Sequence, residues 1–116
     1  MKLAAIVFGV MLCLGPALPV AAGEIALMVV NIETPQGVKI WEPASLVARK
    51  GDTVALKLIN RHADEHGYEI AAFNVKAVVE GNKSKDVSFT ADKAGIFPIK
   101  CHLHPAHVVG QLLVIE

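Results

Sequence analysis

After position 23, hydrophobic and polar residues alternate with a period of two over short runs, which is the pattern of β-strands with one buried face. The run 53–60 (TVALKLIN) shows this most clearly, because Val54, Leu56 and Leu58 fall on one face and Lys57 falls on the other. Clusters of Gly, Pro, Asn and Asp separate the runs and indicate turns. The same reading predicts strands at 24–32, 38–41, 45–49, 53–60, 66–73, 75–79, 86–91, 96–101 and 111–116.

No segment beyond the first 22 residues repeats its hydrophobic positions at the helical period over the length of a helix. Short strands spaced about ten residues apart are typical of a β-sandwich or barrel. The sequence therefore predicts one all-β domain, residues 23–116, built as a sandwich with Greek-key connections.

The N-terminal segment has a different pattern. Residues 3–22 carry no charge and follow Lys2, and the helix breakers Pro16 and Pro19 precede small residues that end at Ala22. This arrangement predicts a signal peptide, residues 1–22, cleaved after Ala22, and hence export to the periplasm. The alternative is an uncleaved anchor, since 20 uncharged residues are long enough to span a bilayer.

Composition changes this picture in two ways. The chain of 116 residues has 11 basic and 11 acidic side chains, and loss of Lys2 with the signal peptide leaves 10 against 11. Such a balance argues against nucleic acid or a charged membrane surface as the partner. Cleavage also removes Cys13, so Cys101 would be the only thiol left and no disulfide could form within the domain.

The stretch CHLHPAH, residues 101–107, contains the candidate chemistry. Cys101, His104 and His107 recur at every third position, and in a tight turn their side chains can converge. Thiolate sulfur and imidazole nitrogen are the ligands that copper and zinc prefer. A further ligand has to come from elsewhere, and His66 opens a predicted strand whose neighbours face inward. By position, His62 in its loop and His102 by strand parity are expected to be exposed.

Two longer stretches resemble the cupredoxins, the small blue-copper proteins. They are EPASLVARKGDTVALKLIN and FTADKAGIFPIKCHLHPAH, with His66 between them. The spacing within CHLHPAH is similar to that of amicyanin. The resemblance implies a cupredoxin-like β-sandwich that holds one copper ion per chain, with His66, Cys101 and His104 as the equatorial ligands. His107 then occupies the axial position, where the family usually has Met, and Gly67 replaces an Asn that often ties two loops together.

Other features resemble nitrosocyanin, a red copper protein, and they leave alternatives open. A close axial imidazole should weaken the copper–thiolate bond and lower the reduction potential. Glu65 is a candidate carboxylate ligand by the same resemblance, although a solvated loop acid is the simpler interpretation. One Cys and three His also suit a structural zinc site.

The resemblance implies one-electron transfer between periplasmic protein partners, rather than an enzyme. In cupredoxins the partners dock on an apolar patch around the exposed histidine, here His104, and the patch would consist of Ala63, Pro105, Ala106, Val108 and Val109. Packing of the same loop onto the domain is the alternative for some of these residues. The competing functions are a periplasmic copper carrier or buffer, and an open site for a small molecule such as nitric oxide. A homo-oligomer is compatible with the resemblance, and no membrane contact is expected after cleavage.

Overall fold

The structure is a computed structural model, and it describes residues 4–6, 9–10, 12–16 and 22–116. Half of the predicted signal peptide lies outside the described residues, and the described parts of it contain neither helix nor strand. In the part of the chain that is described, no helix has the length and the apolar character required to cross a membrane.

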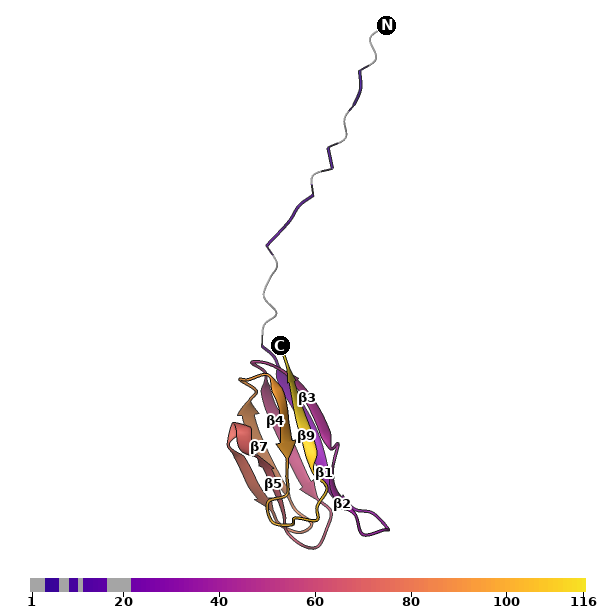
Figure 1. The fold of residues 1–116 in the computed structure, drawn as a ribbon, viewed down its shortest axis with the longest axis vertical. Helices are drawn as coiled ribbons and strands as arrows, with labels where there is room; N and C mark the ends of the chain where they lie inside the picture. Colours follow the sequence, from indigo (N-terminus) through magenta and orange to yellow (C-terminus); the bar gives the residue numbers. More distant parts are fainter. Residues whose placement is uncertain (1–3, 7–8, 11, 17–21) are drawn as a thin grey trace.

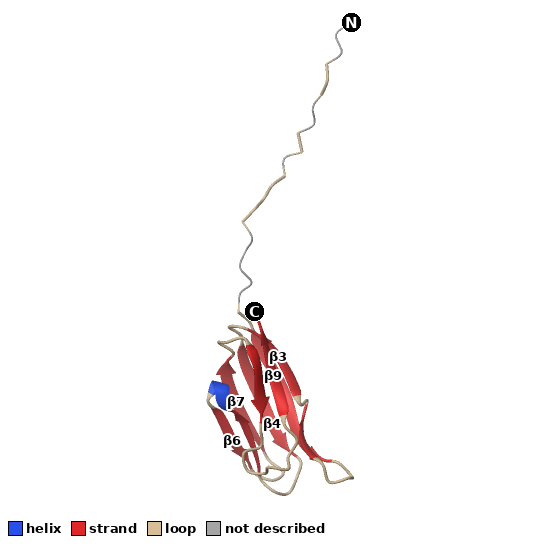
Figure 2. Cartoon of the chain, in the orientation of Figure 1, coloured by secondary structure: helices blue, strands red, loops and turns tan. Residues whose placement is uncertain are grey.

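Strands make up almost all of the regular structure between residues 22 and 116 (Figure 2). One short 3-10 helix, η1 (Ala71–Phe73), interrupts them. The strands are β1 (Glu24–Glu33), β2 (Lys39–Glu42), β3 (Ser45–Arg49), β4 (Thr53–Asn60), β5 (His66–Ile70), β6 (Val75–Val79), β7 (Ser84–Thr90), β8 (Gly95–Ile99) and β9 (Gly110–Ile115). The all-β architecture expected from the period-two pattern is therefore confirmed.

The strands form two layers (Figure 1). The first layer is a four-stranded sheet in the order β2-β1-β4-β7, in which β1 and β4 run parallel. The second layer contains the sheet β3-β9-β8 and the hairpin β5–β6. An antiparallel bridge between Glu69 and Lys100 joins β5 to the end of β8, through backbone hydrogen bonds of 2.8 and 2.9 Å.

The core lies between the layers and follows the alternation seen in the sequence. Val54, Leu56 and Leu58 of β4 are at most 1 % exposed, and Tyr68 and Ile70 of β5 are completely buried. Burial of one such side chain contributes about 1.5 to 3 kcal/mol. The strand β8 is an edge strand, as expected from Pro98, which cannot donate a backbone hydrogen bond to a neighbour.

Two predicted strands extended too far. The strand expected at 66–73 ends at Ile70, because the chain turns through η1 and Asn74 adopts a left-handed conformation with a φ of 55°. The strand expected at 96–101 ends at Ile99. Cys101 therefore lies in the loop after β8, one residue beyond the bridge at Lys100.

One end of the sandwich gathers the segments that carry the candidate ligands. Loop 61–65 follows β4 and loop 100–109 follows β8, and both lie at the lower end of the molecule in Figure 1. Loop 61–65 packs tightly on the turn before β7, since a Cβ atom at Gly81 would lie 1.8 Å from the carbonyl oxygen of Ala63. The Asn82 N–H also donates to the carbonyl oxygen of His62 at 3.0 Å.

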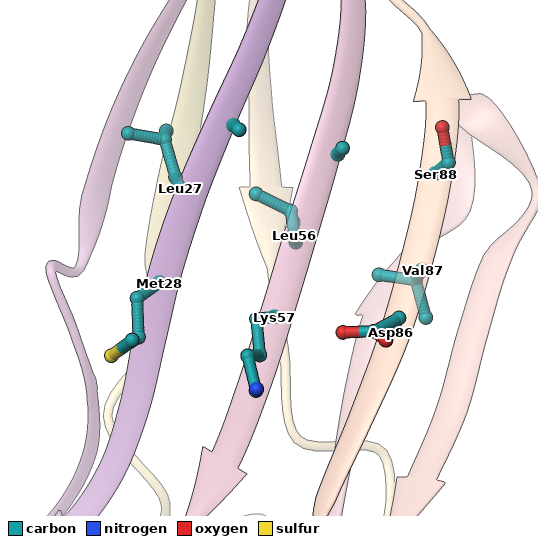
Figure 3. A pocket seen from close by; sticks show the side chains of 9 residues that line it. Leu27, Met28, Leu56, Lys57, Asp86, Val87 and Ser88 are labelled. Carbon is teal, nitrogen blue, oxygen red and sulfur yellow. The ribbon is translucent and has the colours of Figure 1, made fainter.

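A hollow of about 550 Å³ lies elsewhere, on the outer face of the four-stranded sheet (Figure 3). Its floor is a row of small side chains in register across three strands, Ala26, Ala55 and Ser88, beside a row with longer ones that includes Met28 and Lys57. The lining offers no set of metal ligands. The chemistry indicated by the sequence therefore belongs to the loop-bearing end of the sandwich.

Candidate metal centre

Three side chains converge where β5 begins and β8 ends. The Sγ atom of Cys101 lies 3.4 Å from Nδ1 of His104 and 3.9 Å from Nδ1 of His66. One potential ligand atom from each of the three residues lies within 4.8 Å of the other two, and we call this group the ligand cluster. His66 is completely buried and Cys101 is 7 % exposed, whereas His104 is only partly buried. The structure thus brings together three of the four residues that the sequence indicated.

The sulfur atom of Cys101 has a fixed backbone donor. The N–H of Gly67 donates to Sγ at 3.2 Å, and thiolate sulfur, the metal-binding form of cysteine, is a good acceptor for such a bond. Glycine is required at this position by close packing, because a Cβ atom on Gly67 would lie 2.5 Å from Nδ1 of His102. The expectation that His102 is exposed was wrong, since its ring packs on Gly67 and its Nδ1 atom is buried.

Burial keeps His66 neutral. Desolvation, followed by repulsion from His104, His107 and His62, lowers the pKa of His66 from 6.5 to about 4. A buried imidazole loses hydration when it is protonated, so the neutral form is favoured. At neutral pH, His66 therefore has a nitrogen lone pair available for a metal.

His107 lies beside the ligand cluster and has other partners. It is 4 % exposed, and its ring centroid is 5.3 Å from that of His66. Its Nε2 atom lies 2.7 Å from Oδ1 of Asn31, and its Nδ1 atom lies 3.2 Å from the carbonyl oxygen of Val108. Burial lowers the pKa of His107 as well. In this structure the His107 ring thus lies next to the ligand cluster and is held by residues that do not belong to it.

His62 was expected to be exposed in its loop, and this expectation was wrong. Only 19 % of its side chain is accessible, and its Nδ1 atom lies 3.2 Å from Nε2 of His66. The backbone of His62 is held by hydrogen bonds to Asn60 and Asn82, and its ring lies between His66 and Glu33. Glu65, the candidate carboxylate ligand, is exposed and is not part of the ligand cluster.

Buried polar side chains that were not predicted from the sequence hold the segments around the ligand cluster. Nδ2 of Asn60 lies 2.7 to 3.3 Å from the carbonyl oxygens of residues 64, 79 and 80, to which it donates. Its Oδ1 accepts from the backbone N–H of His62 and from the side-chain amide of Asn31, both at 3.0 Å. Trp41 Nε1–H donates to the carbonyl oxygen of Gly67 at 2.9 Å. The only available signal was an Asn at the end of a strand whose other inward residues are apolar.

The outer side of the site is apolar and partly open. A hollow of about 220 Å³ lies against His104 and is lined by Gly37, Lys39, Pro105, Ala106 and His107. Leu103, Val108 and Val109, in the same loop as His104, are 37 %, 39 % and 54 % exposed. The ligand cluster is thus accessible from the surface at the edge of His104.

The donor set fits a soft or borderline metal ion. One thiolate and two imidazoles are the ligands that copper prefers, and they also suit zinc. His66 is already in the neutral form that metal binding requires, and the Gly67 N–H would stabilise the thiolate form of Cys101 that a metal binds.

Comparison with known proteins agrees with this interpretation. Residues 3–114 match the family model of the cupredoxin-like domain, so the chain belongs to the cupredoxin-like family. This defines the fold as cupredoxin-like, as the sequence resemblance implied. A search of curated proteins finds no match.

Two solved structures share the fold. A copper nitrite reductase from Nitrosomonas europaea superposes with a TM-score of 0.68 at 20 % identity, over 79 % of this chain and 41 % of that one. The multicopper oxidase mgLAC gives a TM-score of 0.66 at 16 % identity, over 79 % of this chain and 39 % of that one. The present chain therefore spans about two fifths of either protein.

Proposed function

We propose that this protein is an exported electron-transfer protein that holds one copper ion with His66, Cys101 and His104. The observation that carries the proposal is the convergence of one buried thiol and two imidazoles within 4.8 Å on a cupredoxin-like fold. Bound copper supplies a one-electron couple between Cu(I) and Cu(II). A signal peptide at residues 1–22 and a periplasmic location are part of the proposal, and they rest on the N-terminal sequence pattern.

The protein's own residues hold the site ready before a metal arrives. Burial keeps His66 neutral, the Gly67 N–H holds the sulfur of Cys101, and the packing of loop 61–65 limits movement of His66. A site that changes little between oxidation states needs little reorganisation for each electron. Rapid electron transfer with no chemical conversion is therefore the activity that this geometry supports best.

Electrons would cross at the partly exposed edge of His104. The apolar residues around it, Pro105, Ala106, Val108 and Val109, form a surface on which a protein redox partner would dock. Apolar contacts without strong charge favour brief complexes. Replacement of Val109, the most exposed of the valines, by Lys should slow reduction by a partner and leave the copper spectrum unchanged.

Whether His107 binds the metal decides whether the site has three or four protein ligands. In the proposed axial role, its ring would leave its present partners, Asn31 and Val108, and add a fourth ligand that stabilises Cu(II). The test is the visible absorption and EPR spectrum of the Cu(II)-loaded protein beside His107→Met and His107→Ala. An intense thiolate-to-copper band that shifts when His107 becomes Met supports the axial role. The absence of any such band contradicts the copper–thiolate proposal and leaves zinc or a structural role. A band that survives Cys101→Ser contradicts it too, because the band then does not come from the Cys101 sulfur.

A second candidate function follows from the hydrogen bond that Nε2 of His107 donates to Oδ1 of Asn31 in this structure. If His107 keeps it when metal is bound, the three residues of the ligand cluster leave an open position for a small molecule such as nitric oxide. Added azide or nitric oxide would then shift the copper spectrum, and His107→Ala would not. A closed site gives the opposite pair of results, so one titration separates the two functions.

A further inference from the structure

A chain of hydrogen bonds leads from His66 away from the ligand cluster to a carboxylate at the surface. Nε2 of His66 lies 3.2 Å from Nδ1 of His62, and Nε2 of His62 lies 2.7 Å from Oε2 of Glu33. Glu33 is the last residue of β1, whereas His62 belongs to the loop after β4. Two separate segments thus meet behind a ligand side chain, on the side opposite to Cys101.

The backbone fixes which ring nitrogen of His62 carries the proton. The N–H of Asp64 donates to Nδ1 of His62 at 3.2 Å, and a backbone amide is always a donor. The carboxylate of Asp64 is 3.6 Å from the same atom, which is too far for a hydrogen bond. Nδ1 of His62 is therefore the acceptor, and its proton lies on Nε2, from which it donates to Glu33.

The same reasoning extends to His66. An acceptor at Nδ1 of His62 requires a donor at Nε2 of His66, so the neutral His66 ring carries its proton there. Its other nitrogen, Nδ1, is then unprotonated and faces Cys101 Sγ at 3.9 Å. A metal ligand must present a bare nitrogen, and this is the nitrogen that the hydrogen bonds leave bare.

Contacts with neighbouring residues also hold the rings of His62 and His66 in place. Oδ1 of Asn60, which is completely buried, accepts from the N–H of His62 and anchors the start of the loop. The rings of His62 and His66 meet edge to face, with centroids 5.1 Å apart. Glu33 is 37 % exposed, so its carboxylate remains partly hydrated while it accepts from the half-buried ring.

We propose that Glu33 and His62 are positioning residues, which hold His66 as the Nε2-protonated tautomer and aim its bare Nδ1 at the metal. The part that concerns the metal rests on the proposed function. The part that concerns the tautomer belongs to the metal-free protein and can be tested without copper.

The experiment is ¹⁵N NMR of the ring nitrogens of His66 in the metal-free protein at neutral pH. Wild type should show one tautomer, with the proton on Nε2. Two variants remove the chain at different points: His62→Phe keeps an aromatic ring without an acceptor, and Glu33→Ala removes the carboxylate. His62→Phe should mix the tautomers of His66. Glu33→Ala should mix them less, because the Asp64 N–H still donates to Nδ1 of His62, and Glu33→Gln, which retains a side-chain oxygen, should largely restore the wild-type pattern. Glu24→Ala, on the same strand, is the matched control.

Copper titration of the same variants provides the second readout. Loss of such an outer partner typically weakens metal binding by about 10- to 100-fold, so His62→Phe and Glu33→Ala should bind Cu(II) at least about tenfold more weakly. A proton on Nδ1 of His66 in wild type, or an unchanged tautomer in both variants, overturns the proposal. The expected tautomers in a protein that binds no copper would instead leave the positioning role intact and refute the electron-transfer function.

Discussion

A buried polar side chain lies at each end of strand β4, Asp52 directly before it and Asn60 at its last position, but the two side chains serve different purposes. At the start, Asp52 accepts the backbone N–H groups of Gly23 and Arg49 at 2.9 and 2.8 Å. At the end, Asn60 binds three carbonyl oxygens, a backbone N–H and the side chain of Asn31. Asp52 therefore closes a turn with backbone partners alone.

The network at Asn60 continues into side chains that have further partners. Asn31 reaches Nε2 of His107, and the loop that Asn60 anchors carries His62, which contacts His66. One end of the strand is thus a structural closure, and the other supports the proposed metal site. The difference predicts that damage at the Asn60 end changes both stability and metal binding, whereas damage at the Asp52 end changes stability alone.

The largest effect is expected from Asn60→Ala. The substitution leaves buried carbonyl oxygens and the Asn31 amide without their partner, and each unsatisfied group costs about 1 to 3 kcal/mol. We expect the free energy of unfolding to fall by about 3 to 5 kcal/mol, measured by urea denaturation of the metal-free protein. Cu(II) affinity should fall with it. A loss smaller than about 1 kcal/mol would show that water replaces Asn60 without difficulty.

The second largest effect comes from pH. The pKa of His66 is about 4 in the folded protein and near 6.5 when unfolded, so below pH 6.5 the unfolded chain takes up a proton that the folded protein excludes. Stability should therefore fall as pH drops from about 6.5 to 4, by up to about 3 kcal/mol, with His107 acting in the same direction. Urea denaturation of the metal-free protein at pH 7 and pH 4.5 measures the change.

The control for this pH effect is His66→Gln, which cannot be protonated. Its stability should depend less on pH in the same window than that of wild type. The carboxyl group of Asp52 does not confuse the comparison, because backbone hydrogen bonds lower its pKa from 3.8 and any loss from its protonation begins at lower pH. An equal slope in both proteins would place the titration on another group.

A smaller effect is expected where strand β5 contacts loop 100–109. Gly67→Ala would place a methyl group 2.5 Å from Nδ1 of His102, which is a steric overlap. We expect a loss of about 1 to 3 kcal/mol in the free energy of unfolding and a change in the copper spectrum, because Gly67 also donates to Cys101. The double variant with His102→Ala should recover part of both. If the stability losses of Gly67→Ala and His102→Ala simply add in the double variant, the side chain of His102 does not press on residue 67.

Much of the fold was predictable from the sequence, because the period-two pattern directly reports which side of a strand is buried. The inward placement of Val54, Leu56 and Leu58 is confirmed, and so is the all-β architecture. The ends of strands were less predictable. The strand β5 ends where the 3-10 helix η1 begins, and β8 ends at Ile99 although Lys100 still pairs with Glu69, and neither end leaves a periodic signal.

The candidate site also has a part that was predictable from the sequence and a part that was not. The spacing of CHLHPAH was enough to indicate Cys101 and His104, since those residues are neighbours in the chain and meet at 3.4 Å. The supporting side chains were not predictable, because Asn31 and Glu33 come from β1 and reach the site only through the parallel pairing of β1 with β4. His62 was misjudged for a similar reason, since its backbone is held by a hydrogen bond to Asn82.

The smallest effect at the metal site is expected from Asp52→Asn, and it sharpens the contrast between the two ends of β4. The amide keeps one acceptor oxygen but loses the second, so one of the N–H groups of Gly23 and Arg49 loses its partner. The melting temperature of the metal-free protein should fall by a few degrees, and the loss of stability below pH 4 due to this carboxylate should disappear. Because the side chain contacts backbone at the far end of β4, the copper spectrum and affinity should match wild type. A shifted spectrum would mean that β4 transmits strain along its whole length to His66, and that the two ends are one structural unit after all.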